Sequence, residues 1–223
     1  MITLHDFNKL HSDIESTINS TLDAIKNNNE DNYIIFIADG DYMSNTAQGF
    51  LPYVIDSRRD IYGDETRREF LNTILNNFYS FNKSNIRPPF STVVVEDNEI
   101  QISVELMVYS HIWESEYYLK KCNRLALLSM GKPYKWKLEI PSMQKSNFIN
   151  DEIIKNLRQS NNSLETFFTH SYDNKLRNSF AHCSYSLDSK KKTITVKYQK
   201  KENGNTKPFH MTNGVLCFVS HFY

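Results

Sequence analysis

The fold is decided by residues 102–130, which read ISVELMVYSHIWESEYYLKKCNRLALLSM. Apolar side chains recur at helical spacing on two faces of this stretch: Leu106, Tyr109, Trp113, Tyr117 and Leu128 on one, and Val104, Val108, Ile112, Leu119 and Cys122 on the other. Gly131 and Pro133 follow, as is typical of a helix end. A helix that is apolar on nearly all sides is buried, so the stretch predicts the central helix of a bundle.

Further helices are predicted on both sides of the central one. An amphipathic helix carries Leu10, Ile14, Ile18, Leu22 and Ile25 and ends in the polar run 26–32, and a second helix spans 64–81. Downstream, helices are expected at 150–159 and 163–187, the latter broken near residue 170. Residues 33–37 predict a short buried strand or helical turn, and residues 132–146 a loop.

The hydrophobic period changes to two near the C-terminal end. Residues 193–198, a turn at 202–205 and residues 209–211 predict a β-hairpin, and residues 215–219 predict a further strand. The predicted fold class is therefore mainly α with a small C-terminal β-hairpin. Residues 1–60 are predicted to form an N-terminal helical extension, and residues 61–223 the main helical domain with its hairpin.

Composition gives no global reason for binding nucleic acid or a membrane. The 223 residues include 26 Lys and Arg against 26 Asp and Glu, so the formal net charge is zero. No run of 18 apolar residues and no basic-then-apolar leader is present, so we expect a cytoplasmic protein without a membrane span. Three widely spaced cysteines, Cys122, Cys183 and Cys217, are expected to be reduced thiols.

The main functional signal is the hexamer at residues 177–182, Arg-Asn-Ser-Phe-Ala-His, within an apolar helical stretch. Arg stays charged and His titrates near neutral pH, so the pair suits phosphate binding and proton transfer. Residues five apart on a helix differ by about 140° of rotation around the helix axis and by about 7.5 Å of rise along it. Arg177 and His182 can therefore converge only if the start of the helix is irregular, if the long Arg side chain curls back, or if a second copy of the helix completes the site. Asn178 shares a face with His182, so its amide can orient the imidazole. The alternative is a structural histidine and a salt-bridged arginine.

The pattern Arg-Asn-x-x-Ala-His resembles the Arg-x(4–6)-His signature of the HEPN superfamily (higher eukaryotes and prokaryotes nucleotide-binding), and residues 64–187 resemble its helical bundle loosely. The resemblance implies a homodimer with facing motifs, and many members are metal-independent endoribonucleases of toxin, abortive-infection and antiviral defence systems. It implies that Arg177 stabilises the scissile phosphate, His182 transfers protons and Asn178 supports them, giving a 2′,3′-cyclic phosphate and a 5′-hydroxyl. No cofactor and no metal is implied. In members paired with a nucleotidyltransferase antitoxin, a Tyr lies two residues after the His, where this chain has Ser184.

Physical chemistry supports this division of roles. Attack by the RNA 2′-hydroxyl creates a dianionic phosphorane, which an Arg fork can stabilise in place of a metal. General acid–base catalysis needs a group whose pKa lies near the working pH, as that of His does. RNA carries its own nucleophile, so no metal-activated water is required.

A basic segment follows the motif and is the predicted RNA-binding surface. Between residues 175 and 201, basic residues outnumber acidic ones by seven. Phosphates would be attracted to Lys175, Lys190, Lys191 and Lys192, and Tyr185 could stack a base. The alternative is a solvated hairpin whose lysine-rich edge discourages aggregation.

Other polar residues support no competing site. Glu114 and Glu116 could act on the motif, but a helix surface or a structural ion pair is the favoured interpretation. Asp39-Gly40-Asp41 predicts a turn rather than a metal site. The His and Cys residues lack zinc-ligand spacing, and no glycine-rich phosphate loop is present.

The sequence therefore predicts a bacterial, metal-independent endoribonuclease acting on RNA such as tRNA, with a second copy and an inhibitor or antitoxin protein as partners. One alternative is a non-catalytic HEPN-like scaffold that binds RNA or protein. The other is a structural protein whose Arg–His pair is internal.

Overall fold

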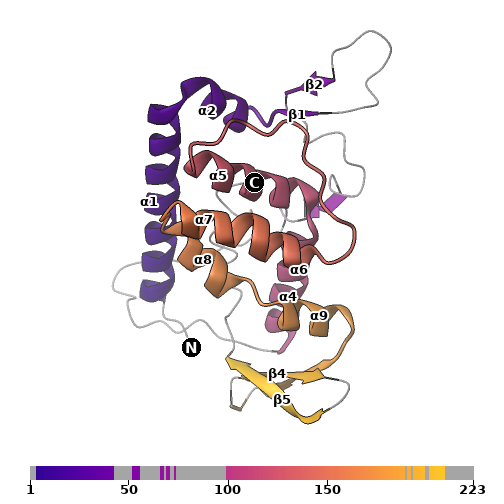
Figure 1. Ribbon diagram of the computed structural model, residues 1–223. Coiled ribbons are helices and arrows are strands. Elements are labelled where there is room, and N and C mark those ends of the chain that lie inside the picture. Colours follow the sequence, from indigo (N-terminus) through magenta and orange to yellow (C-terminus); the bar gives the residue numbers. More distant parts are fainter. Residues whose placement is uncertain are drawn as a thin grey trace. The chain divides into compact units, whose positions relative to one another are not determined.

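The computed structural model of the chain describes residues 4–42, 52–55, 66–67, 69–70, 73, 99–188, 190–191, 193–198 and 201–208. The fold is mainly helical, as predicted, with two small antiparallel sheets (Figure 1). The chain divides into two compact units. The first draws on Met1–Glu15, Phe70–Trp113 and His170–Tyr223, and the second on Ser16–Glu69 and Glu114–Thr169.

The N-terminal helix is confirmed as α1 (Leu4–Asn28), with Ile14, Ile18 and Ile25 buried. The next element is a helix, α2 (Glu30–Ile37), which starts at Asn29 because its side chain accepts a hydrogen bond from the Asn32 amide. The expectation of a buried segment at 33–37 is only partly correct. Phe36 is buried, whereas Ile34 is 55% exposed and Ile37 is 49% exposed.

The predicted central helix is in fact two helices, α4 (Glu99–Glu114) and α5 (Glu116–Ser129). Ser115 separates them because its backbone is extended and its hydroxyl accepts a hydrogen bond from the Tyr118 amide, which caps α5. The predicted burial is confirmed on both sides of this break for Tyr109, Trp113 and Tyr117, but it is wrong for Val104, which is 36% exposed. The predicted helix end is also confirmed, because Gly131 takes the left-handed conformation after it, with φ of 71°.

A second helical run follows the loop. It consists of α6 (Lys145–Phe148), a π-helical segment η2 (Ile149–Ile154) and α7 (Lys155–Gln159), and so begins before the predicted residue 150. In the second unit, α5 packs against α2, η2 and α7. These contacts bury Ile149, Ile153 and Leu157.

The helical prediction for 163–187 is confirmed up to Ala181, including a break, and is wrong for residues 182–187. The structure has α8 (Leu164–Ser171), a break near the expected position, and α9 (Asn174–Ala181). Cys183 takes a left-handed conformation, with φ of 50°, and the chain then enters β3 (Tyr185–Asp188). A left-handed residue cannot continue an α-helix, so the motif lies at the end of a short helix.

The C-terminal hairpin is extended to a three-stranded antiparallel sheet. Its order is β3, β4 (Thr193–Tyr198) and β5 (Lys201–Pro208), and α9 packs against β4. The turn predicted at 202–205 is wrong, because these residues belong to β5. A two-stranded sheet pairs β1 (Asp41–Tyr42) with β2 (Tyr53–Val54).

Several predicted features lie wholly or largely outside the described residues: the helix at 64–81, the segment 209–211, the strand at 215–219, Lys192 and Cys217. Within the described part of the chain, Cys122 and Cys183 are free thiols. In that same part, no helix is both long and apolar enough to cross a membrane.

Candidate functional site

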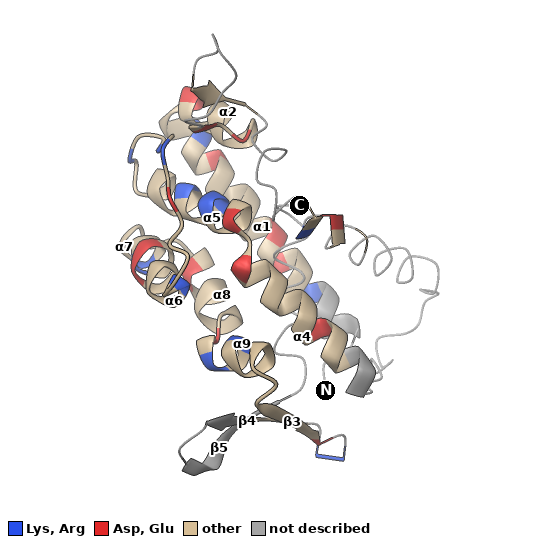
Figure 2. Cartoon of the chain, turned by 90° about the vertical axis from the view of Figure 1, so that its right-hand side faces the viewer, with Lys and Arg blue, Asp and Glu red and all other residues tan. Residues whose placement is uncertain are grey.

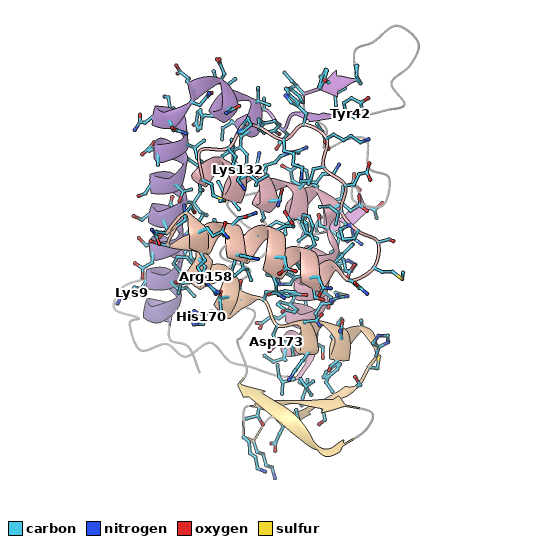
Figure 3. All side chains as sticks on the ribbon, viewed as in Figure 1. Lys9, Tyr42, Lys132, Arg158, His170 and Asp173 are labelled. Carbon is cyan, nitrogen blue, oxygen red and sulfur yellow. The ribbon has the colours of Figure 1, made fainter. Side chains whose placement is uncertain are left out.

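The motif helix α9 is fixed at its start by Asp173. The carboxylate of Asp173 accepts hydrogen bonds from the amides of Lys175, at 2.8 Å, and Leu176, at 2.9 Å. These bonds satisfy two of the amides that a helix leaves open at its N-terminus, so α9 begins at a defined residue. Figure 3 labels Asp173 at this end of the helix.

Tyr109 of α4 anchors the same point from within the first unit. Its hydroxyl donates to the Asp173 carbonyl, at 3.1 Å, and accepts from the Asp173 amide, at 2.7 Å. Burial raises the pKa of Tyr109 far above its ordinary value, while the Arg177 guanidinium is close enough to oppose that rise in pKa. Tyr109 is therefore a neutral hydrogen-bonding group that positions α9.

The three motif residues differ in exposure. Arg177 and Asn178 are half-buried, whereas His182 is exposed. His182 is the first residue after the helix, and its amide donates to the Asn178 carbonyl, at 3.0 Å. That bond is between backbone groups, so orientation of the imidazole by the Asn178 side chain stays a prediction.

Helix geometry separates the two reactive side chains within one chain. The backbone from Arg177 to Ala181 is regular helix, and His182 follows it directly. Positions five apart on such a helix are turned by about 140° and separated by about 7.5 Å along the axis. One α9 helix therefore does not present Arg177 and His182 on a single face.

The basic residues predicted to bind RNA lie at two places in the first unit. Lys175 is exposed in the first turn of α9. Figure 2 shows basic residues of this helix in blue. Lys190 and Lys191 are exposed in the turn between β3 and β4, where the Asp188 carboxylate accepts from both of their amides. Tyr185, at the other end of β3, is half-buried and its ring lies 5.6 Å from that of Phe180. Lys190 and Lys191 are separated from the end of α9 by the length of β3, since a four-residue strand spans roughly 10 Å.

An apolar hollow of about 730 Å³ adjoins the motif. Its lining comes from α4, the end of α9 and the start of β3: Ser103, Val104, Met107, Phe180, Ala181, Cys183 and Tyr185. Val104 is 36% exposed although it is a large aliphatic residue on a helix that is otherwise mostly buried. We call this surface the α4–α9 hollow.

Glu114 has a structural role. Its carboxylate forms an ion pair with Lys145, at 3.0 Å, and its carbonyl accepts from the same ammonium group, at 2.8 Å. The interpretation of Glu114 as part of a structural ion pair is therefore confirmed. Glu116 lies in the first turn of α5, where an acidic side chain is favourable.

The sequence prediction missed a group of buried charges in the second unit. The group, which we call the buried charge cluster, comprises the buried Asp39, Asp41, Lys121 and Arg124 and the half-buried Lys120. Asp41 accepts from Lys120, at 2.7 Å, and from Arg124, at 2.6 Å, and Asp39 accepts from Lys121. Basic and acidic positions are visible on α5 in Figure 2.

Residues of the buried charge cluster also form hydrogen bonds with neighbouring side chains and backbone carbonyls. The Tyr117 hydroxyl donates to Asp39, at 3.0 Å, and Lys121 donates to the Phe36 carbonyl, at 2.6 Å. Arg124 also donates to the carbonyls of Lys135 and Trp136. The predicted turn at 39–41 is confirmed, with Asp39 at φ of 52°, but its carboxylates are structural counter-charges. A signal was present in the sequence, since Lys120, Lys121 and Arg124 interrupt the apolar pattern of α5.

Among the described residues, no group of three or more His, Cys, Asp or Glu side chains is arranged to hold a metal ion. Comparison of the chain with family models, with curated proteins and with solved structures finds no match. The resemblance to HEPN proteins therefore rests on the motif residues and the helical character of the chain.

Proposed function

We propose that this protein is a HEPN-like endoribonuclease that cleaves RNA without a metal ion. The observation that carries the proposal is the placement of the motif. Arg177, which is half-buried, and Asn178 lie on one short, capped helix, and the exposed His182 follows the end of that helix directly. A guanidinium group and an accessible titratable imidazole are the two kinds of group that phosphodiester transfer requires, and a second copy of α9 would bring them to the same phosphate.

The proposed reaction uses the RNA 2′-hydroxyl as nucleophile. The 2′-oxygen attacks phosphorus as its proton passes to a general base, and the P–O5′ bond breaks as a general acid protonates the 5′-oxygen. The products are a 2′,3′-cyclic phosphate and a 5′-hydroxyl. His182 supplies proton transfer and Arg177 stabilises the charge on the phosphorane, with Asn178 as the supporting polar residue.

We further propose that the active species is a homodimer. One α9 helix does not present Arg177 and His182 on a single face, whereas two facing copies supply two imidazoles and two guanidinium groups to one phosphate. The α4–α9 hollow is the surface assigned to the second copy, because it is apolar, contains the exposed Val104 and continues directly into the motif.

RNA would reach the site along Lys175, Lys190, Lys191 and Lys192. The proposed setting is a bacterial toxin or phage-defence system in the cytoplasm, in which an inhibitor or antitoxin protein restrains the activity. The second candidate is a HEPN-like scaffold that binds RNA or protein without cleaving it. The exposed lysines support this candidate equally, because they can bind RNA whether or not cleavage follows.

The decisive experiment is incubation of the purified protein with total tRNA and a generic RNA in EDTA, followed by a denaturing gel and typing of the RNA ends. Wild type should give cyclic-phosphate ends. His182→Ala should lower cleavage by about 10²–10⁴-fold, the usual contribution of a general acid or base. Arg177→Lys keeps the charge but loses the bidentate fork, and should lower cleavage by about 10²-fold or more.

His170→Ala is the matched control, because His170 is also exposed but lies in the last turn of α8, outside the motif. It should cleave like wild type. Cleavage by His182→Ala at the wild-type rate would exclude the proposed mechanism. Binding of RNA that stays intact with wild type would favour the scaffold.

A further inference from the structure

The loop between α5 and α6 forms an aromatic and basic surface with the small sheet of the second unit. The Trp136 ring of this loop lies 5.2 Å from that of Tyr53 in β2, and the Tyr53 ring lies 5.6 Å from that of Tyr42 in β1. The loop runs past these two strands on its way to α6 (Figure 1). Tyr53 is 55% exposed, and Trp136 and Tyr42 are half-buried. A flat ligand can therefore stack on this group of rings.

Two lysines of the loop border the rings. Lys135 and Lys137 are exposed, whereas Tyr134 and Leu138, which alternate with them, are buried. The two lysines therefore lie on the solvent side of the loop. The Lys137 ammonium lies 5.8 Å from the centre of the Tyr42 ring. We call this surface the lysine–aromatic face, which consists of Tyr42, Tyr53, Lys135, Trp136 and Lys137.

Gly40 allows the Trp136 ring to rest directly on the backbone. A Cβ atom at Gly40 would lie 2.8 Å from Cζ3 of Trp136 and 2.6 Å from Cγ2 of Ile35, so a larger residue does not fit there. The Tyr134 hydroxyl donates to the Gly40 carbonyl, at 2.5 Å, and joins the loop to the same point. The ring is therefore held in one position before any ligand binds.

The buried charge cluster fixes the backbone of the loop. Arg124 donates to the carbonyls of Lys135, at 3.1 Å, and Trp136, at 2.9 Å, and is itself paired with Asp41. Buried ion pairs add little net stability against an apolar replacement. The cluster is therefore better explained by the loop that it positions than by the stability that it adds.

The charge of the loop favours an anionic ligand. Residues 130–144 contain three lysines and one acidic residue, Glu139. Glu139 pairs with Lys137 at 3.6 Å, but both side chains are well exposed and such a pair is weak. Glu30 and Asp31 lie in the first turn of α2, where the positive end of the helix balances them. The lysines of the loop are therefore available to phosphate groups.

We propose that the lysine–aromatic face binds single-stranded RNA, as a second contact for the substrate of the proposed endoribonuclease. Bases would stack on Tyr53 and Trp136, and Lys135 and Lys137 would attract the phosphates. Stacking rings beside cations are how proteins bind single strands, whereas the bases of a duplex are already stacked on one another. The choice of RNA as the strand rests on the proposed function, and the binding of a single strand rests on the face itself.

The test is titration of the full chain with an unstructured oligouridylate of about eight nucleotides, a length within the range of single-strand sites. His182→Ala is the parent protein, so that the RNA is not cleaved during the titration. The chain has two tryptophans, and Trp113 is buried, so fluorescence quenching by a stacked base reports Trp136. We expect saturable quenching by the oligouridylate and little quenching by a fully paired RNA duplex.

Tyr53→Ala should weaken binding by about fivefold or more, because a stacked base is lost, whereas Tyr53→Phe keeps the ring and should bind like the parent protein. Lys135→Gln should lower the slope of log K against log salt by about 0.7, the value for one phosphate contact. Lys155→Gln is the matched control, because Lys155 is an exposed lysine of α7 in the same unit, outside the face. It should leave the affinity within about twofold and the slope unchanged.

The proposal would be overturned by RNA binding that leaves Trp136 unquenched, by equal quenching with the duplex, or by equal effects of Lys135→Gln and Lys155→Gln. If Tyr53→Ala does not fold, Lys135→Gln still decides, because its side chain is exposed. The two proposals fail separately. Quenching without cleavage by wild type would support the face and count against the nuclease, whereas cleavage without quenching would support the nuclease and exclude the face.

Discussion

At the scale of single residues, Asp41 holds two cations at once. One carboxylate oxygen accepts from Lys120 and the other from Arg124, and Arg124 also fixes the loop through two carbonyls. Buried ion pairs add little net stability against an apolar replacement, but removal of one member leaves an uncompensated buried charge. Asp41 should therefore be among the least replaceable residues of the second unit.

Asp41→Ala should lower the free energy of unfolding by about 3–5 kcal/mol, because Lys120 and Arg124 would lose their counter-charge in a buried site. Urea denaturation of the wild type and the variant measures the difference. Glu139→Ala is the control, since Glu139 pairs with Lys137 at 3.6 Å while both side chains are well exposed. Little change is expected there, and a similar loss in both variants would contradict the structural role given to the buried charge cluster.

The motif residues were visible in the sequence, whereas the buried charge cluster showed only its three cations on α5 and not the carboxylates that pair with them, for a physical reason. Arg177, Asn178 and His182 are neighbours along the chain, so their spacing alone places them on one element. Asp39 and Lys121 are 82 positions apart, and Asp41 and Arg124 are 83 apart. Their pairing is decided by tertiary packing, which local periodicity does not contain.

At the scale of elements, α9 depends on its neighbours because it is only eight residues long. An isolated helix of that length is not stable in water, since the cost of nucleation is not recovered. Asp173 and Tyr109 supply the missing constraint at one end, and Cys183 ends the helix at the other. The helix that carries the motif therefore depends for its geometry on residues outside it.

Asp173→Ala should destabilise α9 by about 1 kcal/mol, the usual effect of removing an N-cap side chain. Hydrogen–deuterium exchange should then speed up at the α9 amides, and RNA cleavage should fall because the motif is less ordered. Asn29→Ala removes the equivalent cap of α2 and is the control. It should speed exchange in α2 alone, and unchanged exchange of α9 in Asp173→Ala would show that the cap is dispensable.

Element boundaries were predicted less well than elements. The end at Gly131 was evident because glycine is the usual left-handed residue. The end after Ala181 was not, since the left-handed residue there is Cys183, which carries no such signal. The break at Ser115 was also hidden, because a single serine among apolar residues reads equally well as helix interior or N-cap.

At the scale of the whole molecule, catalysis is proposed to depend on a second copy. The chain carries no net charge, so long-range repulsion does not oppose self-association. The α4–α9 hollow supplies an apolar contact next to the motif. A substitution in the hollow that prevents formation of the proposed dimer should therefore also abolish cleavage.

Val104→Asp should convert the dimer to a monomer and abolish cleavage, because a carboxylate would be desolvated in an apolar interface. Sedimentation analysis and the tRNA assay measure the two effects. Ile34→Asp makes the same kind of change at an exposed aliphatic residue of α2, outside the hollow, and should leave both unchanged. A wild-type protein that cleaves RNA as a monomer would exclude the proposed assembly.

The buried charge cluster also determines how the chain can be shortened. Deletion of residues 1–60 would remove Asp39 and Asp41 together, while Lys120, Lys121 and Arg124 would remain on α5. The fragment 61–223 would then contain three neighbouring cations that had lost the carboxylates with which they form ion pairs. Such a fragment should aggregate or recruit anions during purification, and RNA that co-purified with it would report the missing N-terminal segment rather than the motif.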